Sequence, residues 1–108
     1  RITAEQFATI HENEKPLTID IRKKSEFQSQ HITDAVNIPL NEINNHLAEF
    51  PKDKPFILHC AGGYRSMIAA SMLKQRGWDN FSDVIGGFTE IAKTNVPKSE
   101  YICPSTML

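Results

Sequence analysis

One cysteine and one arginine in this 108-residue chain lie at a spacing that suits nucleophilic chemistry on an anion. Cys60 follows a short apolar run, and Arg65 comes five positions later, with Gly62 and Gly63 between them. A thiolate is a strong nucleophile, and a guanidinium group offers a planar fork of N–H donors to an oxyanion. A nearby cation and a helix N-terminus both stabilise a thiolate. We therefore expect Cys60 to react as a thiolate; the alternative is a small buried packing residue.

The segments on either side of Cys60 predict a strand followed by a helix. Before it, 55–58 is a short apolar run opened by proline, which is typical of a buried parallel strand. After it, Ser66 can cap a helix that ends at Gly77. In such a turn, backbone N–H groups and the positive end of the helix dipole point into one small concavity. The sequence therefore predicts an anion-binding loop formed by Ala61, Gly62, Gly63, Tyr64, Arg65 and Ser66.

Helix and strand patterns alternate along the rest of the chain. Strand patterns occur at 17–22, 35–40, 55–58 and 81–85. Helix signals are a capping box at Thr3, a second at Ser25, an N-cap at Asn41 and a glycine turn at 86–87. This alternation predicts a three-layer α/β/α domain with a mostly parallel sheet of about five strands. Ligands bind at the carboxyl ends of the strands in such sheets, where Cys60 lies.

Length and composition limit the other classes of function. A chain of 108 residues forms one domain, and its net charge of −1, with scattered lysines, argues against a nucleic-acid partner. No apolar run approaches the roughly 20 residues that span a bilayer, so we expect no membrane partner. The chain begins at Arg1, so we expect a piece of a longer protein with 98–108 as its tail. Two cysteines, Cys60 and Cys103, do not make a disulfide framework, which favours a cytoplasmic location. No group of His, Cys and Asp residues in the sequence has the spacing of a zinc site.

The Cys-x4-Arg loop between a strand and a helix resembles the active-site loop of the rhodanese sulfurtransferases. Related dual-specificity phosphatases have one more residue in this loop, which makes it wide enough for phosphate. Three further segments are similar to rhodanese motifs. They are the Asp-x-Arg of 20–22, the Glu-Phe and His-Ile segment of 26–39, and the Gly-Gly turn of 83–88. The resemblance covers nearly the whole chain and implies a rhodanese-like fold.

This resemblance implies an enzyme of the thiosulfate:cyanide sulfurtransferase type. Cys60 would attack the outer sulfur of a thiosulfate-like or polysulfide donor, form a persulfide, and pass the sulfur to a thiol or cyanide. Arg65 would hold the anionic end of the donor, unless its role is structural only. Asp20 and Arg22 would form an internal pair that braces the loop rather than takes part in the reaction. The resemblance implies no metal and no organic cofactor.

Several alternatives remain open at this stage. His59 could be a general base, but neighbouring residues of a strand point to opposite faces, so we expect a structural role. Cys103 could resolve the persulfide or have no function. The Cys-Pro-Ser-Thr ending at Cys103 also resembles rhodanese domains fused to metallo-β-lactamase-type hydrolases, which would supply a fused or associated partner domain. The other functions left open are a sulfur-relay or docking module, and a cysteine-dependent phosphatase or arsenate reductase.

Overall fold

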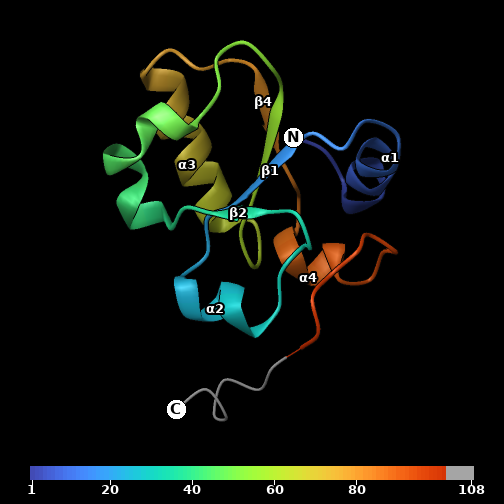
Figure 1. The fold of residues 1–108 in the computed structure, drawn as a ribbon. Coiled ribbons are helices and arrows are strands. Elements are labelled where there is room, and N and C mark those ends of the chain that lie inside the picture. Colours follow the sequence, from blue (N-terminus) through green and yellow to red (C-terminus); the bar gives the residue numbers. More distant parts are fainter. Residues whose placement is uncertain (102–108) are drawn as a thin grey trace.

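Short parallel strands, separated along the chain by helices, form one sheet in this protein (Figure 1). The computed structural model describes residues 1–101. The strands are β1 (Leu17–Asp20), β2 (Val36–Asn37), β3 (Phe56–His59) and β4 (Phe81–Asp83). Their order is β2-β1-β3-β4, and a parallel bridge between Ile2 and Val84 adds one residue beside β4. The predicted α/β fold is confirmed, with four strands in the described residues where about five were expected.

Helices cover both faces of the sheet (Figure 1). They are α1 (Ala4–Glu14), α2 (Lys24–Ser29), α3 (Tyr64–Gln75) and α4 (Gly87–Ile91), with the 3-10 helices η1 (Leu40–Asn45) and η2 (Leu47–Glu49). Helix α3 and the two 3-10 helices lie against one face, and α1 and α4 lie against the other. Helix α2 lies at the end of the sheet where the strands finish. Among the described residues, no helix is long and apolar enough to cross a membrane.

The central strand β3 is buried along its whole length, because helices cover both of its faces. Phe56 and Leu58 pack in the core on the α3 side, whereas Ile57 packs in the core on the side of α1 and α4. This alternation is the two-residue period of a strand. Full burial of such a side chain contributes about 1.5–3 kcal/mol. The two cores therefore hold β3 firmly, and with it the cysteine that follows.

The first two helix starts test the predicted capping boxes. The box at Thr3 is confirmed, since its hydroxyl accepts the backbone N–H three residues later. The box at Ser25 is wrong, because α2 already begins at Lys24. Glu26 accounts for this earlier start: its Oε1 accepts the backbone N–H of Lys23 at 3.1 Å. The carboxylate thereby satisfies a donor that the first turn leaves without a helical partner.

The predicted α-helix capped by Asn41 is also wrong. This segment forms η1 and η2 instead, and Asn41 lies inside η1, whose N-cap is Pro39. Asparagine side chains compete with the helix backbone for hydrogen bonds, and η1 contains Asn44 and Asn45 as well. Three asparagines in six residues favour two short tight turns over one continuous α-helix.

The first residues of the predicted tail pack against the domain. Lys98 forms an antiparallel bridge with Ile32, and the Ser99 backbone N–H donates to the carbonyl of His31 at 2.8 Å. The His31 N–H in turn donates to Ser99 Oγ at 3.0 Å. Lys98 and Ser99 thus belong to the fold, while Cys103 lies outside the described residues.

Candidate active site

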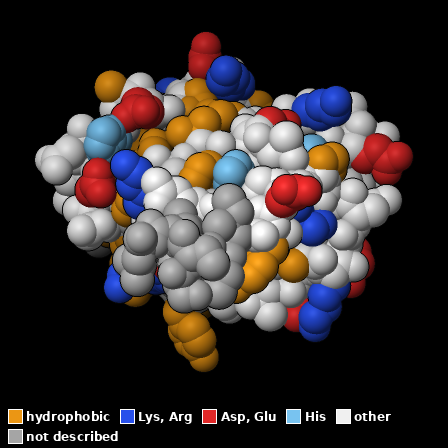
Figure 2. Space-filling view, turned by 60° about the horizontal axis from the view of Figure 1, so that its bottom comes forward, with side chains coloured by type: hydrophobic (Ala, Val, Ile, Leu, Met, Phe, Trp, Pro, Cys, Tyr) orange, Lys and Arg blue, Asp and Glu red, His pale blue; other side chains and the backbone are white. Residues whose placement is uncertain are grey.

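Cys60 is buried directly after β3, at the end of the sheet that Figure 2 brings forward. Its Sγ accepts the backbone N–H groups of Gly63 and Ser66, at 3.1 and 3.3 Å. Ser66 Oγ lies 3.7 Å from the same sulfur. N–H groups aimed at one atom stabilise negative charge on it, as in other anion-binding loops. Two backbone N–H groups of the predicted loop, from Gly63 and Ser66, therefore point at the sulfur, and anion binding by the whole loop stays a prediction.

Gly63 gives the loop its shape. It takes a left-handed conformation, with φ at 104°, and a side chain there would press on the backbone N of Gly86. Gly63 is also the N-cap of α3, so the prediction that Ser66 caps this helix is wrong. Glycine adopts this left-handed conformation readily because it has no Cβ, and the conformation turns the chain sharply into the helix. At Gly62, by contrast, a Cβ would meet open space.

The first turn of α4 packs directly on the loop. The Phe88 N–H donates to the carbonyl of Cys60 at 2.6 Å, and the Thr89 N–H donates to that of Ala61 at 3.0 Å. A Cβ on Gly87 would overlap both carbonyl oxygens. These bonds engage the carbonyl groups with α4, while N–H groups of the loop engage the sulfur. The Gly-Gly turn at 86–87 thus allows the carbonyl groups of Cys60 and Ala61 to point at α4, while N–H groups of the loop point at the sulfur.

Asp83 supports the loop from behind and was given no role in the sequence analysis. This buried residue ends β4, and its Oδ2 lies 3.3 Å from Ser66 Oγ and 2.9 Å from Arg1 Nε. Ser66 Oγ also donates to the carbonyl of Gly63 at 3.1 Å. The sequence could have indicated this role, because Asp83 is a polar residue at the carboxyl end of a strand, and such residues face the site in parallel sheets.

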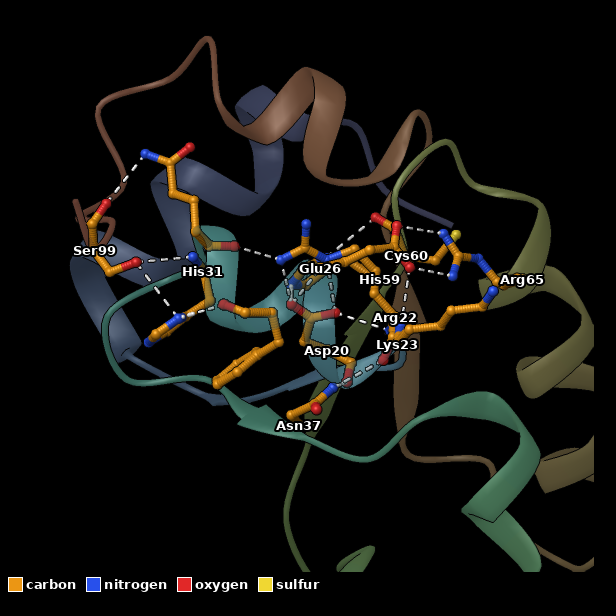
Figure 3. A network of polar contacts seen from close by, with 12 residues as sticks. Asp20, Arg22, Lys23, Glu26, His31, Asn37, His59, Cys60, Arg65 and Ser99 are labelled. Atoms are coloured by element: carbon orange, nitrogen blue, oxygen red, sulfur yellow. Dashed lines mark hydrogen bonds and ion pairs between the residues drawn. The ribbon is translucent and has the colours of Figure 1, made fainter. Parts of the chain in front are cut away.

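Arg65 forms a two-pronged ion pair with Glu26 (Figure 3). Its Nη1 lies 2.7 Å from one carboxylate oxygen, and its Nη2 lies 3.1 Å from the other. The hydrogen bond with Glu26 raises the pKa of Arg65, and the hydrogen bond with Arg65 lowers the pKa of Glu26. Glu26 belongs to the segment of 26–39 that resembles a rhodanese motif, but its contact with Arg65 was not predicted. Residue types 39 positions apart give no local signal for such a pair.

Asp20 and Arg22 form a second pair, in the interior behind the loop (Figure 3). The Asp20 carboxylate accepts from Nε and Nη2 of Arg22, at 3.0 and 2.8 Å, and from its backbone N–H. Arg22 Nη2 also donates to the carbonyl of Gln30, and its guanidinium group lies 4.4 Å above the ring of Phe88. The pair thus joins the end of β1 to the end of α2 and to Phe88 of α4, whose N–H binds the carbonyl of Cys60; that the pair braces the loop stays a prediction.

His59 lies opposite Asp20 in the sheet register and is completely buried. Its ring stacks on Phe88 of α4, whereas Cys60 packs in the core on the α3 side. This placement matches the predicted alternation. Burial lowers the pKa of His59, although the charge of Asp20 acts in the opposite direction. The ring is therefore neutral near pH 7, with Nε2 3.7 Å from Asp20 Oδ2.

The outer rim of the site is formed by residues of different character. Tyr64 is 82% exposed at the start of α3, beside the loop that it was predicted to shape. On the face shown in Figure 2, Lys and Arg side chains lie beside Asp and Glu rather than in one broad patch. Within residues 1–101, no group of three or more His, Cys, Asp or Glu side chains could hold a metal ion. Because positive and negative side chains alternate on this face, an anion would be attracted by single cationic side chains rather than by a broad positive surface.

Comparison with known proteins agrees with this geometry. A family model described as Rhodanese-like domain matches residues 3–94. The thiosulfate sulfurtransferase GlpE of Pseudomonas syringae pv. syringae is 34% identical, over 91% of this chain and 91% of that protein. The adenylyltransferase and sulfurtransferase uba4 of Ogataea parapolymorpha is 32% identical over 83% of this chain, which spans only 23% of that relative.

A solved structure gives the same result for the fold. The crystal structure of a rhodanese-related protein from Thermoplasma volcanium superposes with a TM-score of 0.79 at 30% identity, and the match covers 91% of this chain and 95% of that one. Relatives named sulfurtransferase indicate sulfur transfer as the general activity associated with this domain. The match covers the sheet, the cysteine loop and the helix that caps it, so this chain belongs to the rhodanese-like family.

Proposed function

We propose that this domain is a sulfurtransferase that carries a sulfane sulfur as a persulfide on Cys60. The observation that supports it best is the pair of backbone N–H groups, from Gly63 and Ser66, that point at the cysteine sulfur. They would stabilise the attacking thiolate and then the charged outer sulfur of the persulfide. The likeness to a thiosulfate sulfurtransferase over almost the whole chain supports the same activity.

The reaction would proceed in two displacements. The Cys60 thiolate attacks the outer sulfur of thiosulfate, a new sulfur–sulfur bond forms, and sulfite leaves with the electron pair of the bond that breaks. Cyanide then attacks the outer sulfur of the persulfide, thiocyanate leaves, and the Cys60 thiolate is restored. A thiolate acceptor would take the sulfur in the same way and become a persulfide itself. The donor could also be polysulfide.

The other residues of the site would position these groups. Arg65 would attract the anionic end of the donor, and Ala61, Gly62 and Tyr64 would line the entrance. Asp20 and Arg22 would keep the end of β1 in place, since their contacts reach α2 and α4. No step in this scheme requires a metal or an organic cofactor.

Intact-mass measurement after brief exposure to thiosulfate tests the proposal. We expect a gain of one sulfur atom that maps to Cys60 and is lost to cyanide with release of thiocyanate. Cys60→Ser, checked for native folding by circular dichroism, should gain none. Absence of sulfur transfer from thiosulfate, polysulfide and 3-mercaptopyruvate alike would refute the proposal, and hydrolysis of an aryl phosphate would favour a phosphatase.

A relay role within a longer protein is the second candidate. The relative uba4 supports it, because the matching segment is only 23% of that chain and its name joins two activities. In this case turnover with small donors would be slow, and transfer to a neighbouring domain would be fast. A partner domain of the metallo-β-lactamase type and a cytoplasmic location stay predictions.

A further inference from the structure

Glu26 is hydrogen-bonded to the guanidinium group of Arg65, the group that would attract an anionic donor. Both of its carboxylate oxygens face Arg65, one on each terminal nitrogen. A sulfonate or another oxyanion would use the same pair of N–H donors, since the planar fork of an arginine matches either group. The carboxylate therefore stands where the charged end of a donor would bind.

The position of Glu26 is fixed by the fold rather than by Arg65 alone. It is the third residue of α2, and its Oε1 also accepts the backbone N–H of Lys23. Arg65 is likewise held, in the first turn of α3. The carboxylate is thus presented by one helix to the guanidinium group of another, close to the loop around Cys60 (Figure 3).

The pair is nevertheless open enough for a ligand to displace it. The side chains of Arg65 and Glu26 are 31% and 33% exposed, so water and solutes reach both. A pair in contact with water separates more easily than an enclosed one, because water solvates the separated charges. The Glu26 carboxylate also keeps its negative charge near pH 7, because Arg65 lowers its pKa. An incoming anion meets this charge as well as an arginine that is already paired.

We infer that Glu26 is a specificity-determining residue, which competes with anionic donors for Arg65 and so favours donors of low charge over sulfonate-bearing ones such as thiosulfate. This inference rests on the proposed function, because it assigns a donor preference to the same site. It also has a consequence that does not depend on sulfur transfer. Removal of the Glu26 charge should make Cys60 more accessible to any small anion.

Alkylation of Cys60 by two reagents of different charge tests the inference. Iodoacetate is an anion and iodoacetamide is neutral, while both place a similar carbon at the thiolate. We expect Glu26→Gln to raise the ratio of the iodoacetate rate to the iodoacetamide rate several-fold, with the modified cysteine identified by peptide mass. Glutamine keeps an oxygen for the Lys23 N–H, so the start of α2 is preserved.

Two further variants make the test specific. Glu12→Gln removes the same charge from an exposed position on α1 and should leave the ratio unchanged. Arg65→Ala combined with Glu26→Gln should lose most of the gain, because the freed guanidinium group is its source. An unchanged ratio in Glu26→Gln, an equal rise in Glu12→Gln, or a full gain without Arg65 would each overturn the inference.

The donor preference is then measured directly. KM for thiosulfate should fall several-fold in Glu26→Gln, and KM for an organic hydropersulfide without a sulfonate group, which passes its outer sulfur to Cys60 and leaves as a thiolate, should change much less. If the alkylation ratio rises but no donor loads sulfur onto Cys60, the proposed function fails and the anion competition stands. If sulfur is transferred normally and neither ratio nor KM changes, the role of Glu26 fails alone.

Discussion

Asp20–Arg22 and Glu26–Arg65 are two arginine–carboxylate pairs with the same chemistry and different surroundings. Asp20 and Arg22 are enclosed behind the active-site loop, with side-chain exposures of 0% and 7%. Glu26 and Arg65 lie at its rim, each about one third exposed. A pair without water must remain closed, because separation would leave buried charges without partners. A pair in contact with water can open, so of these two pairs the rim pair is the one that can exchange its partner for a ligand.

Loss of one charge from the enclosed pair should have the largest effect. Asp20→Asn leaves the Arg22 guanidinium group buried without its counter-ion, and breaking such a pair costs about 3–5 kcal/mol. Urea unfolding measures this loss in the free energy of unfolding. Asp53→Asn, at an exposed position, serves as the control and should change little. A loss below about 1 kcal/mol for Asp20→Asn would place the two pairs in the same class.

The two loop glycines extend the comparison to the backbone. Gly63 is buried and left-handed, so Gly63→Ala should cost about 1–2 kcal/mol in the free energy of unfolding. It should also slow persulfide formation, because one N–H donor to the Cys60 sulfur would move. Gly62→Ala adds a methyl group that faces open space and should stay within about 0.5 kcal/mol. Equal effects at the two positions would contradict the structural difference between them.

Acid should weaken the enclosed region in particular. His59 faces Asp20 and Arg22 from β3, and its pKa lies below the ordinary value of 6.5 because it is buried. Below pH 6.5, His59 binds a proton in the unfolded chain but not in the native state, so the free energy of unfolding falls as the pH falls. The slope from this residue is at most about 1.4 kcal/mol per pH unit. Above pH 6.5 its contribution disappears.

Unfolding experiments between pH 5.5 and 8 check this dependence. His59→Gln should flatten the acid slope, while His46→Gln, at a more exposed position, should leave it unchanged. The prediction is wrong if the slope persists in His59→Gln with native circular dichroism.

Loss of the rim charge should have a much smaller effect on stability than loss of the enclosed one. Glu26→Gln should change the free energy of unfolding by less than about 1 kcal/mol, since the pair is exposed to water. Its pKa is lowered by Arg65, so the contribution is present above the ordinary value of 4.5 and is lost as the pH falls through the native value. Urea unfolding at neutral pH measures it. A destabilisation as large as that of Asp20→Asn would contradict a pair that opens for ligands.

The features that could be predicted from sequence are those set by local pattern. The alternation of strands and helices, the loop after β3 and the opposite orientations of His59 and Cys60 all follow from neighbours along the chain. Asn41 and Ser66 were misassigned as caps because more than one residue could serve, and tertiary packing decides among them. The contact of Glu26 with Arg65 joins two helices, and no spacing within either helix indicates it.

The hydrogen bonds from the first turn of α4 make two amides useful as reporters. The N–H groups of Phe88 and Thr89 are bonded to the carbonyls of Cys60 and Ala61 rather than within their own helix. Their exchange with solvent deuterium therefore requires the cysteine loop to separate from α4. Hydrogen exchange at these two amides would follow each opening of the loop, before and after exposure of the domain to thiosulfate, without any label on the cysteine.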